Sequence, residues 1–128
     1  MNRARRIFWS WGLLVFMVWA PCRAESDIER PAALNKTVTA DDGQKIRYRV
    51  YGTGQETIIF VHGWMCDQSY WERQVADFSR DFRVVTMDLP GHGASDATRK
   101  DWSIEAFGDD VAHVVADLKP LSPVILVG

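Results

Sequence analysis

Three short apolar runs, separated by two segments with helical periodicity, constrain the fold of this chain most strongly. Thr57–Val61, Val84–Met87 and Val124–Val127 are almost wholly apolar on both faces, which is typical of parallel strands buried between layers of helices. The order strand, helix, strand, helix, strand predicts a βαβαβ unit with right-handed crossovers. The sequence therefore predicts an α/β fold in which a parallel sheet carries helices on both faces.

The two predicted helices have recognisable start and stop residues. Ser69 and Glu72 form the S-x-x-E pattern of a capping box, so the first helix is expected to begin with Ser69 as its N-cap. The second helix is expected to begin at Ser103 and to end before Pro120. The apolar stripe of the first helix consists of Trp71, Val75, Phe78 and Phe82. The stripe of the second consists of Ile104, Phe107, Val111, Val114 and Leu118.

An antiparallel β-hairpin is expected to precede the parallel unit. Lys36–Ala40 and Lys45–Val50 have the composition of strands, and the turn residues Asp41-Asp42-Gly43 join them. In the second strand apolar residues alternate with basic ones, so one face is expected to be buried and the other solvated.

The first 24 residues have the pattern of a secretory signal. Met1–Arg6 is basic, Ile7–Ala20 is almost wholly apolar, and Pro21 then breaks the helix before a small-residue cleavage site that ends at Ala24. The apolar run is shorter than the ~20 residues that a membrane-spanning helix needs. We therefore expect a periplasmic or secreted protein. An uncleaved membrane anchor and a lipid attached to Cys22 are the alternatives.

The rest of the chain is expected to form a polar lead-in over residues 25–35 and one incomplete domain over residues 36–128. The formal net charge is −2 although the first 24 residues carry four arginines and no acid, so the body is acidic. An acidic body without a basic stripe argues against nucleic-acid binding. Only Cys66 remains after Ala24, so the expected mature chain has no intrachain disulfide.

Distinctive residues follow each of the three apolar strands. His62-Gly63-Trp64 follow the first, Asp88–Ser95 (DLPGHGAS) follow the second, and Gly128 follows the third. In this order and spacing they resemble the motifs of the α/β-hydrolase family, which are His-Gly-x, D-x-P-G-H-G-x-S and the first glycine of the G-x-S-x-G nucleophile elbow. The resemblance covers residues 36–128 and implies the N-terminal half of an α/β-hydrolase fold. In that family the last strand has a further neighbour, so its outer edge and apolar faces are expected to be uncovered here.

The resemblance also implies roles for these residues. The backbone N–H of Trp64 would form part of an oxyanion hole, with Gly63 allowing the turn and His62 organising the loop through a hydrogen bond. The Trp64 side chain would line the acyl or leaving-group pocket, or would alternatively belong to the core. Gly128 would lead into the elbow, with the nucleophile two positions later and no catalytic side chain within the chain. The loop that shapes the site would include Asp88, Gly91, His92 and Gly93.

The expected function is hydrolysis of a small-molecule carboxylic ester by a serine nucleophile, with this chain inactive because the triad would lie beyond Gly128. The alternatives are an aspartate-nucleophile dehalogenase or epoxide hydrolase, a lipase or cofactor-free peroxidase, and a non-catalytic truncated protein. Met65 argues against the epoxide branch, where a proline often follows His-Gly-x. No cofactor is expected. The histidines are too scattered for a zinc motif, and Asp96 stands where a dinucleotide fingerprint after Gly91 needs its third glycine.

Overall fold

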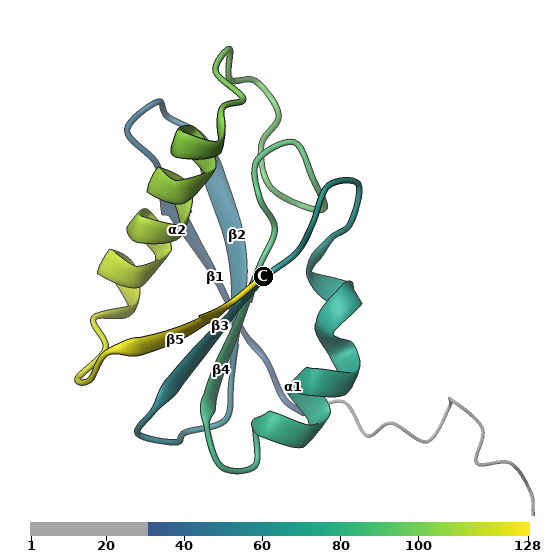
Figure 1. Cartoon of the computed structure of the whole chain (residues 1–128), viewed down its shortest axis with the longest axis vertical. Coiled ribbons are helices and arrows are strands. Elements are labelled where there is room, and N and C mark those ends of the chain that lie inside the picture. Colours follow the sequence, from purple (N-terminus) through teal and green to yellow (C-terminus); the bar gives the residue numbers. More distant parts are fainter. Residues whose placement is uncertain (1–30) are drawn as a thin grey trace, which may run out of the picture.

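A five-stranded mixed sheet forms the centre of the molecule in the computed structural model, which describes residues 31–128 (Figure 1). The expected secretory segment over residues 1–24, and most of the lead-in, lie outside the described residues. Within residues 31–128, none of the helices combines the length and apolar character needed to cross a membrane.

The elements follow the predicted order along the chain. The strands are β1 (Leu34–Thr39), β2 (Lys45–Tyr51), β3 (Thr57–Val61), β4 (Arg83–Met87) and β5 (Val124–Val127). The helical segments are the short 3-10 helix η2 (Gln68–Trp71), α1 (Glu72–Phe78) and α2 (Ile104–Leu118). The strand β1 begins at Leu34, two residues before the predicted start at Lys36.

The strand order is β1-β2-β4-β3-β5. The β1–β2 and β2–β4 pairs are antiparallel, whereas β3 pairs in parallel with both β4 and β5. Along the sheet, the step from β3 to β4 runs toward β1, whereas the step from β4 to β5 runs away from β1. Because both crossovers have the same hand, their helices α1 and α2 lie on opposite faces of the sheet (Figure 1). The predicted α/β architecture with helices on both faces is confirmed.

The sheet divides the core into two apolar clusters, one under each helix. The cluster on the α2 face includes Ile46, Tyr48 and Val50 of β2, so the predicted buried face of this strand is confirmed. The smaller cluster on the α1 face centres on Ile58, Phe60, Val75 and Val84. The strand β5 is the outermost of the described strands, and its Ile125 and Leu126 are half-exposed, as expected of a strand without a further neighbour.

The predicted capping box at Ser69 is wrong. Asp67 is the N-cap of η2, and its carboxylate accepts a hydrogen bond from the Ser69 N–H at 2.8 Å. The carboxylate is a charged acceptor for the Ser69 N–H, and the chain makes a tight 3-10 turn before α1 begins at Glu72. Phe82 lies four residues beyond the end of α1, although its ring still packs against that of Phe78 with 6.0 Å between centroids.

The predicted boundaries of α2 are confirmed. Ser103 is the N-cap, and its Oγ accepts a hydrogen bond from the Ala106 N–H at 3.2 Å. The helix ends at Leu118, and Lys119 adopts a left-handed conformation directly before Pro120. The predicted stripe is wrong at its first position, because Ile104 is 81% exposed and the packed stripe begins one turn later.

Candidate active site

The loops that follow β3 and β4 begin at the same edge of the sheet as Gly128, which follows β5. In the parallel registers Val61 lies opposite Met87 and Phe60 lies opposite Val127, so the three strands end side by side. A Cβ on Gly128 would lie 3.6 Å from Val61 O, an ordinary contact distance. Within the described residues no close approach therefore demands a glycine at this position, and the interpretation of Gly128 as the start of an elbow stays a prediction.

Asp88 is a buried carboxylate that joins two of these loops. Its two oxygens accept hydrogen bonds from the Gln68 N–H at 2.8 Å, the Gln68 Nε2 at 2.7 Å and the Ala94 N–H at 2.9 Å. The Ser95 hydroxyl donates to the Asp88 carbonyl at 2.6 Å. Because these donors satisfy the buried charge, Asp88 holds η2 against the loop after β4.

The geometry of the loop after β4 requires glycine at two positions. Gly91 and Gly93 have φ values of 84° and 52°, in the region that side chains disfavour. A Cβ on Gly91 would lie 2.7 Å from the Trp102 ring, and a Cβ on Gly93 would lie 2.3 Å from the Asp88 carboxyl carbon. Both positions therefore combine a left-handed backbone with a close approach, and the loop is built around these residues.

His62 is buried and uses both ring nitrogens for backbone contacts. Its Nε2 accepts a hydrogen bond from the Leu89 N–H at 3.1 Å, so this nitrogen carries no proton. The proton therefore resides on Nδ1, which lies 2.8 Å from Gly63 O and donates to it. His62 thereby links the loop after β3 to the loop after β4.

In the peptide group between Gly63 and Trp64, the carbonyl oxygen accepts hydrogen bonds and the N–H donates none to the described residues. Gly63 O accepts hydrogen bonds from His62 Nδ1 and, at 3.2 Å, from the Cys66 N–H. The peptide is trans, so the Trp64 N–H points in the direction opposite to Gly63 O. No acceptor for the Trp64 N–H exists among the residues that the structure describes. The arrangement thus offers an oriented and unused backbone donor.

The sharp bend of this loop lies at Met65 and not at Gly63. Met65 has a φ of 60°, whereas Gly63 lies outside the left-handed region and a Cβ there would meet nothing within 4 Å. The expectation that Gly63 provides the bend is therefore wrong. A left-handed conformation costs a residue with a side chain roughly 1–2 kcal/mol, so neighbouring contacts must maintain it at Met65.

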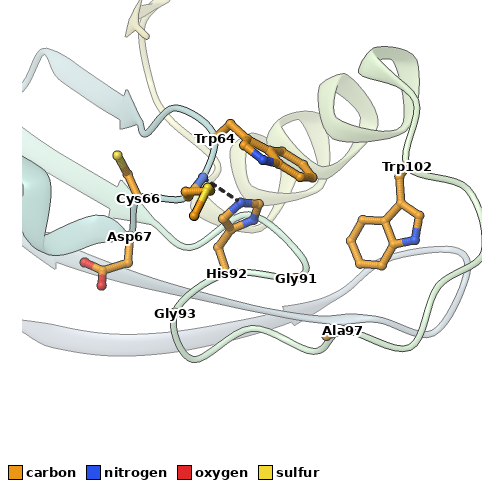
Figure 2. A pocket seen from close by; sticks show the side chains of 9 residues that line it. Trp64, Cys66, Asp67, Gly91, His92, Gly93, Ala97 and Trp102 are labelled. Carbon is orange, nitrogen blue, oxygen red and sulfur yellow. Dashed lines mark hydrogen bonds between the residues drawn. The ribbon is translucent and has the colours of Figure 1, made fainter.

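An open pocket of about 630 Å³ lies beside this loop (Figure 2). Figure 2 shows the rings of Trp64 and Trp102 on one side of the pocket and Asp67 on the other, with His92 close to Trp64. Trp64 is 71% exposed, so the alternative that it is a core residue is wrong. The lining residues are Trp64, Met65, Cys66, Asp67, Gly91, His92, Gly93, Ala97 and Trp102.

A buried ion pair that the sequence did not reveal supports the pocket wall. The Arg99 guanidinium donates two hydrogen bonds to Asp110 at 2.6 and 2.8 Å, and it lies 5.9 Å from the ring centre of Trp102. Burial raises the pKa of the Asp110 carboxyl above its usual range, although the hydrogen bonds from Arg99 act in the opposite direction. An arginine and an aspartate eleven positions apart match no sequence motif, so this ion pair could not be predicted from the sequence.

The described part of the chain contains no cluster of three or more histidine, cysteine or acidic side chains that could hold a metal ion. Cys66 is a free thiol of intermediate exposure on the pocket wall. Hydrogen bonds from Ser69 to the Asp67 carboxylate lower the pKa of this group, so it is a stable anion at the rim.

The model of the alpha/beta hydrolase family matches residues 58–128, more than half of the chain. The five-stranded mixed sheet, the helices on its two faces and the loops at its carboxyl edge agree with this match. The chain therefore belongs to the alpha/beta hydrolase family.

Known relatives of this chain are longer enzymes. A non-heme haloperoxidase from Rhodococcus erythropolis is 37% identical over 82 residues, which are 63% of this chain and 30% of that protein. The bifunctional esterase/perhydrolase DCH from Acinetobacter calcoaceticus is 38% identical over 80 residues, 61% of this chain and 29% of that protein. The crystal structure of bromoperoxidase from Bacillus anthracis superposes with a TM-score of 0.68 at 29% identity, covering 74% of this chain and 34% of that one. The chain thus spans about a third of the length of these relatives.

Proposed function

We propose that the full-length protein is an exported serine hydrolase that cleaves carboxylic esters. The observation that carries this proposal is the unused Trp64 N–H, fixed through Gly63 O at the edge where three parallel strands end. The similarity to a bifunctional esterase/perhydrolase supports the same reaction class.

The chemistry follows from the position of this donor. A serine at the tip of the elbow attacks the ester carbonyl, and a histidine accepts the serine proton. Negative charge then develops on the carbonyl oxygen, where the Trp64 N–H donates a hydrogen bond. One such donor contributes roughly 3 kcal/mol to stabilising the transition state. We place the serine two positions after Gly128, and the acid and the histidine later in the full-length protein.

The pocket walls favour an ester with an apolar group. Trp64 and Trp102 present large aromatic surfaces, and Met65 adds a flexible thioether that is 85% exposed. The single acidic group of the pocket, Asp67, lies away from the two tryptophan rings (Figure 2). An uncharged acyl or leaving group therefore suits this wall better than an anionic one.

Fluorophosphonate labelling of the full-length protein tests the reaction class. We expect hydrolysis of p-nitrophenyl butyrate and covalent modification of the serine two positions after Gly128, identified by peptide mass spectrometry. An aspartate at that position, with turnover of an epoxide or haloalkane, would indicate the aspartate-nucleophile branch instead. A protein that takes up no label and turns over none of these substrates would contradict an enzymatic role.

Export is the second part of the proposal and needs its own measurement. The basic start, the apolar run and the small-residue site of residues 1–24 support removal of this segment by a signal peptidase. N-terminal sequencing of the mature protein from its natural host is expected to begin at Glu25. A protein that retains residues 1–24 and fractionates with membranes would support the anchored alternative, and an intact soluble chain in the cytoplasm would refute export.

A further inference from the structure

We propose that His92 is a positioning residue that fixes the oxyanion donor from its C-terminal side. The inference rests on the proposed function, because it assigns His92 to the same Trp64 N–H. The observation that carries it is a hydrogen bond from the Met65 N–H to His92 Nε2 at 3.2 Å, drawn as a dashed line in Figure 2.

Met65 depends on this hydrogen bond for its conformation. Its φ of 60° is unfavourable for a residue with a side chain, and its side chain is almost fully exposed, so packing does not hold it in place. Among the described residues His92 is the acceptor for the Met65 N–H. The bend of the loop after β3 is therefore maintained from the loop after β4.

Contacts within its own loop fix the position of His92. Its backbone N–H donates to Leu89 O at 3.0 Å, and its ring Nδ1 lies 3.2 Å from Pro90 O. Because Nε2 accepts a hydrogen bond, the proton resides on Nδ1, which donates to Pro90 O. The ring packs against the rings of His62 and Trp64, with 5.1 Å between centroids in each case.

The two histidines hold the two peptides that flank Trp64. His62 binds Gly63 O and so fixes the plane that contains the Trp64 N–H, while His92 binds the Met65 N–H and so fixes the next plane. A residue whose two peptide planes are held cannot rotate its backbone freely. The direction of the Trp64 N–H is thus determined before a substrate arrives, which is the preorganisation that oxyanion stabilisation requires.

Two substitutions test separately the hydrogen-bond acceptor of the His92 side chain and the packing of its ring. H92F retains an aromatic ring but has no acceptor for the Met65 N–H, whereas H92Q retains an acceptor but no ring. For H92F we expect kcat for p-nitrophenyl butyrate to fall about ten- to a hundred-fold, with KM changed less than about two-fold, because the donor acts on the transition state. H92Q is expected to restore kcat to within about three-fold of the wild type.

A matched control histidine, His113, belongs to α2 and not to the loops after β3 and β4. His113 is near Asp41, at 3.7 Å, and H113Q is expected to keep the wild-type kcat. Wild-type kcat in H92F, or an equal loss in H92F and H92Q when both unfold cooperatively near the wild-type temperature, would overturn the proposal.

A spectroscopic measurement on the wild type keeps the inference testable without activity. Long-range ¹⁵N–¹H correlation spectra should show His92 protonated on Nδ1, with a coupling through the hydrogen bond between Nε2 and the Met65 amide nitrogen. A protonated Nε2, or no such coupling, would overturn the positioning role even in an active esterase. A protein with the coupling but without turnover of any ester would instead refute the proposed function.

Discussion

Replacing Gly93 by alanine is expected to destabilise the protein by roughly 3–5 kcal/mol. The new Cβ would lie 2.3 to 2.4 Å from the carboxyl carbon and both oxygens of Asp88, so the buried carboxylate must move. The left-handed φ of 52° costs alanine roughly 1–2 kcal/mol. Displacement of Asp88 weakens hydrogen bonds from Gln68 and Ala94, and a hydrogen bond to a charged group contributes roughly 1.5–3 kcal/mol.

Urea unfolding of the full-length protein, followed by tryptophan fluorescence, measures this change. The control is Gly108→Ala in the exposed middle of α2, where an added Cβ meets nothing within 4 Å. This control is expected to stabilise the helix by about 0.5–1 kcal/mol. A Gly93→Ala variant that unfolds within about 0.5 kcal/mol of the wild type would refute the argument, because strain and clash would then both be absent.

Three further predictions concern other parts of the molecule. Arg99→Met is expected to destabilise the protein by roughly 3–5 kcal/mol in urea unfolding, because Asp110 would remain buried without its cation; a fully stable variant would show that the pair is dispensable. Hydrogen bonding from Tyr48 and Lys36 lowers the pKa of Asp117, so its contribution to stability is present above the unfolded value of 3.8 and is lost as the pH falls through the lower folded value. The difference in urea midpoint between the wild type and D117N should therefore shrink between pH 7 and pH 2, and a constant difference would exclude this assignment. The 128-residue chain alone is expected not to hydrolyse p-nitrophenyl esters, because the proposed serine, acid and histidine lie beyond Gly128 and backbone groups occupy both ring nitrogens of His62 and of His92; measurable turnover by the purified chain would contradict this.

Local patterns were sufficient to predict most of the architecture. The buried strands, the hairpin and α2 with its Ser103 cap follow from apolar periodicity and from capping residues, which act over a few neighbouring positions. The order of the three loop motifs likewise indicated the edge of the sheet where they meet. The individual elements follow from the sequence because each depends mainly on interactions within one turn or one strand.

The geometry of the candidate site depends on contacts between segments that are distant in the sequence. The sequence placed the bend at Gly63, whereas the structure places it at Met65, whose N–H donates a hydrogen bond to His92, 27 residues further along the chain. The tautomer of His62, the three hydrogen bonds donated to the Asp88 carboxylate and the pairing of Arg99 with Asp110 also depend on contacts between distant segments. A buried polar atom takes whichever partner the packed chain brings within hydrogen-bonding distance, and only the tertiary structure determines which partner that is.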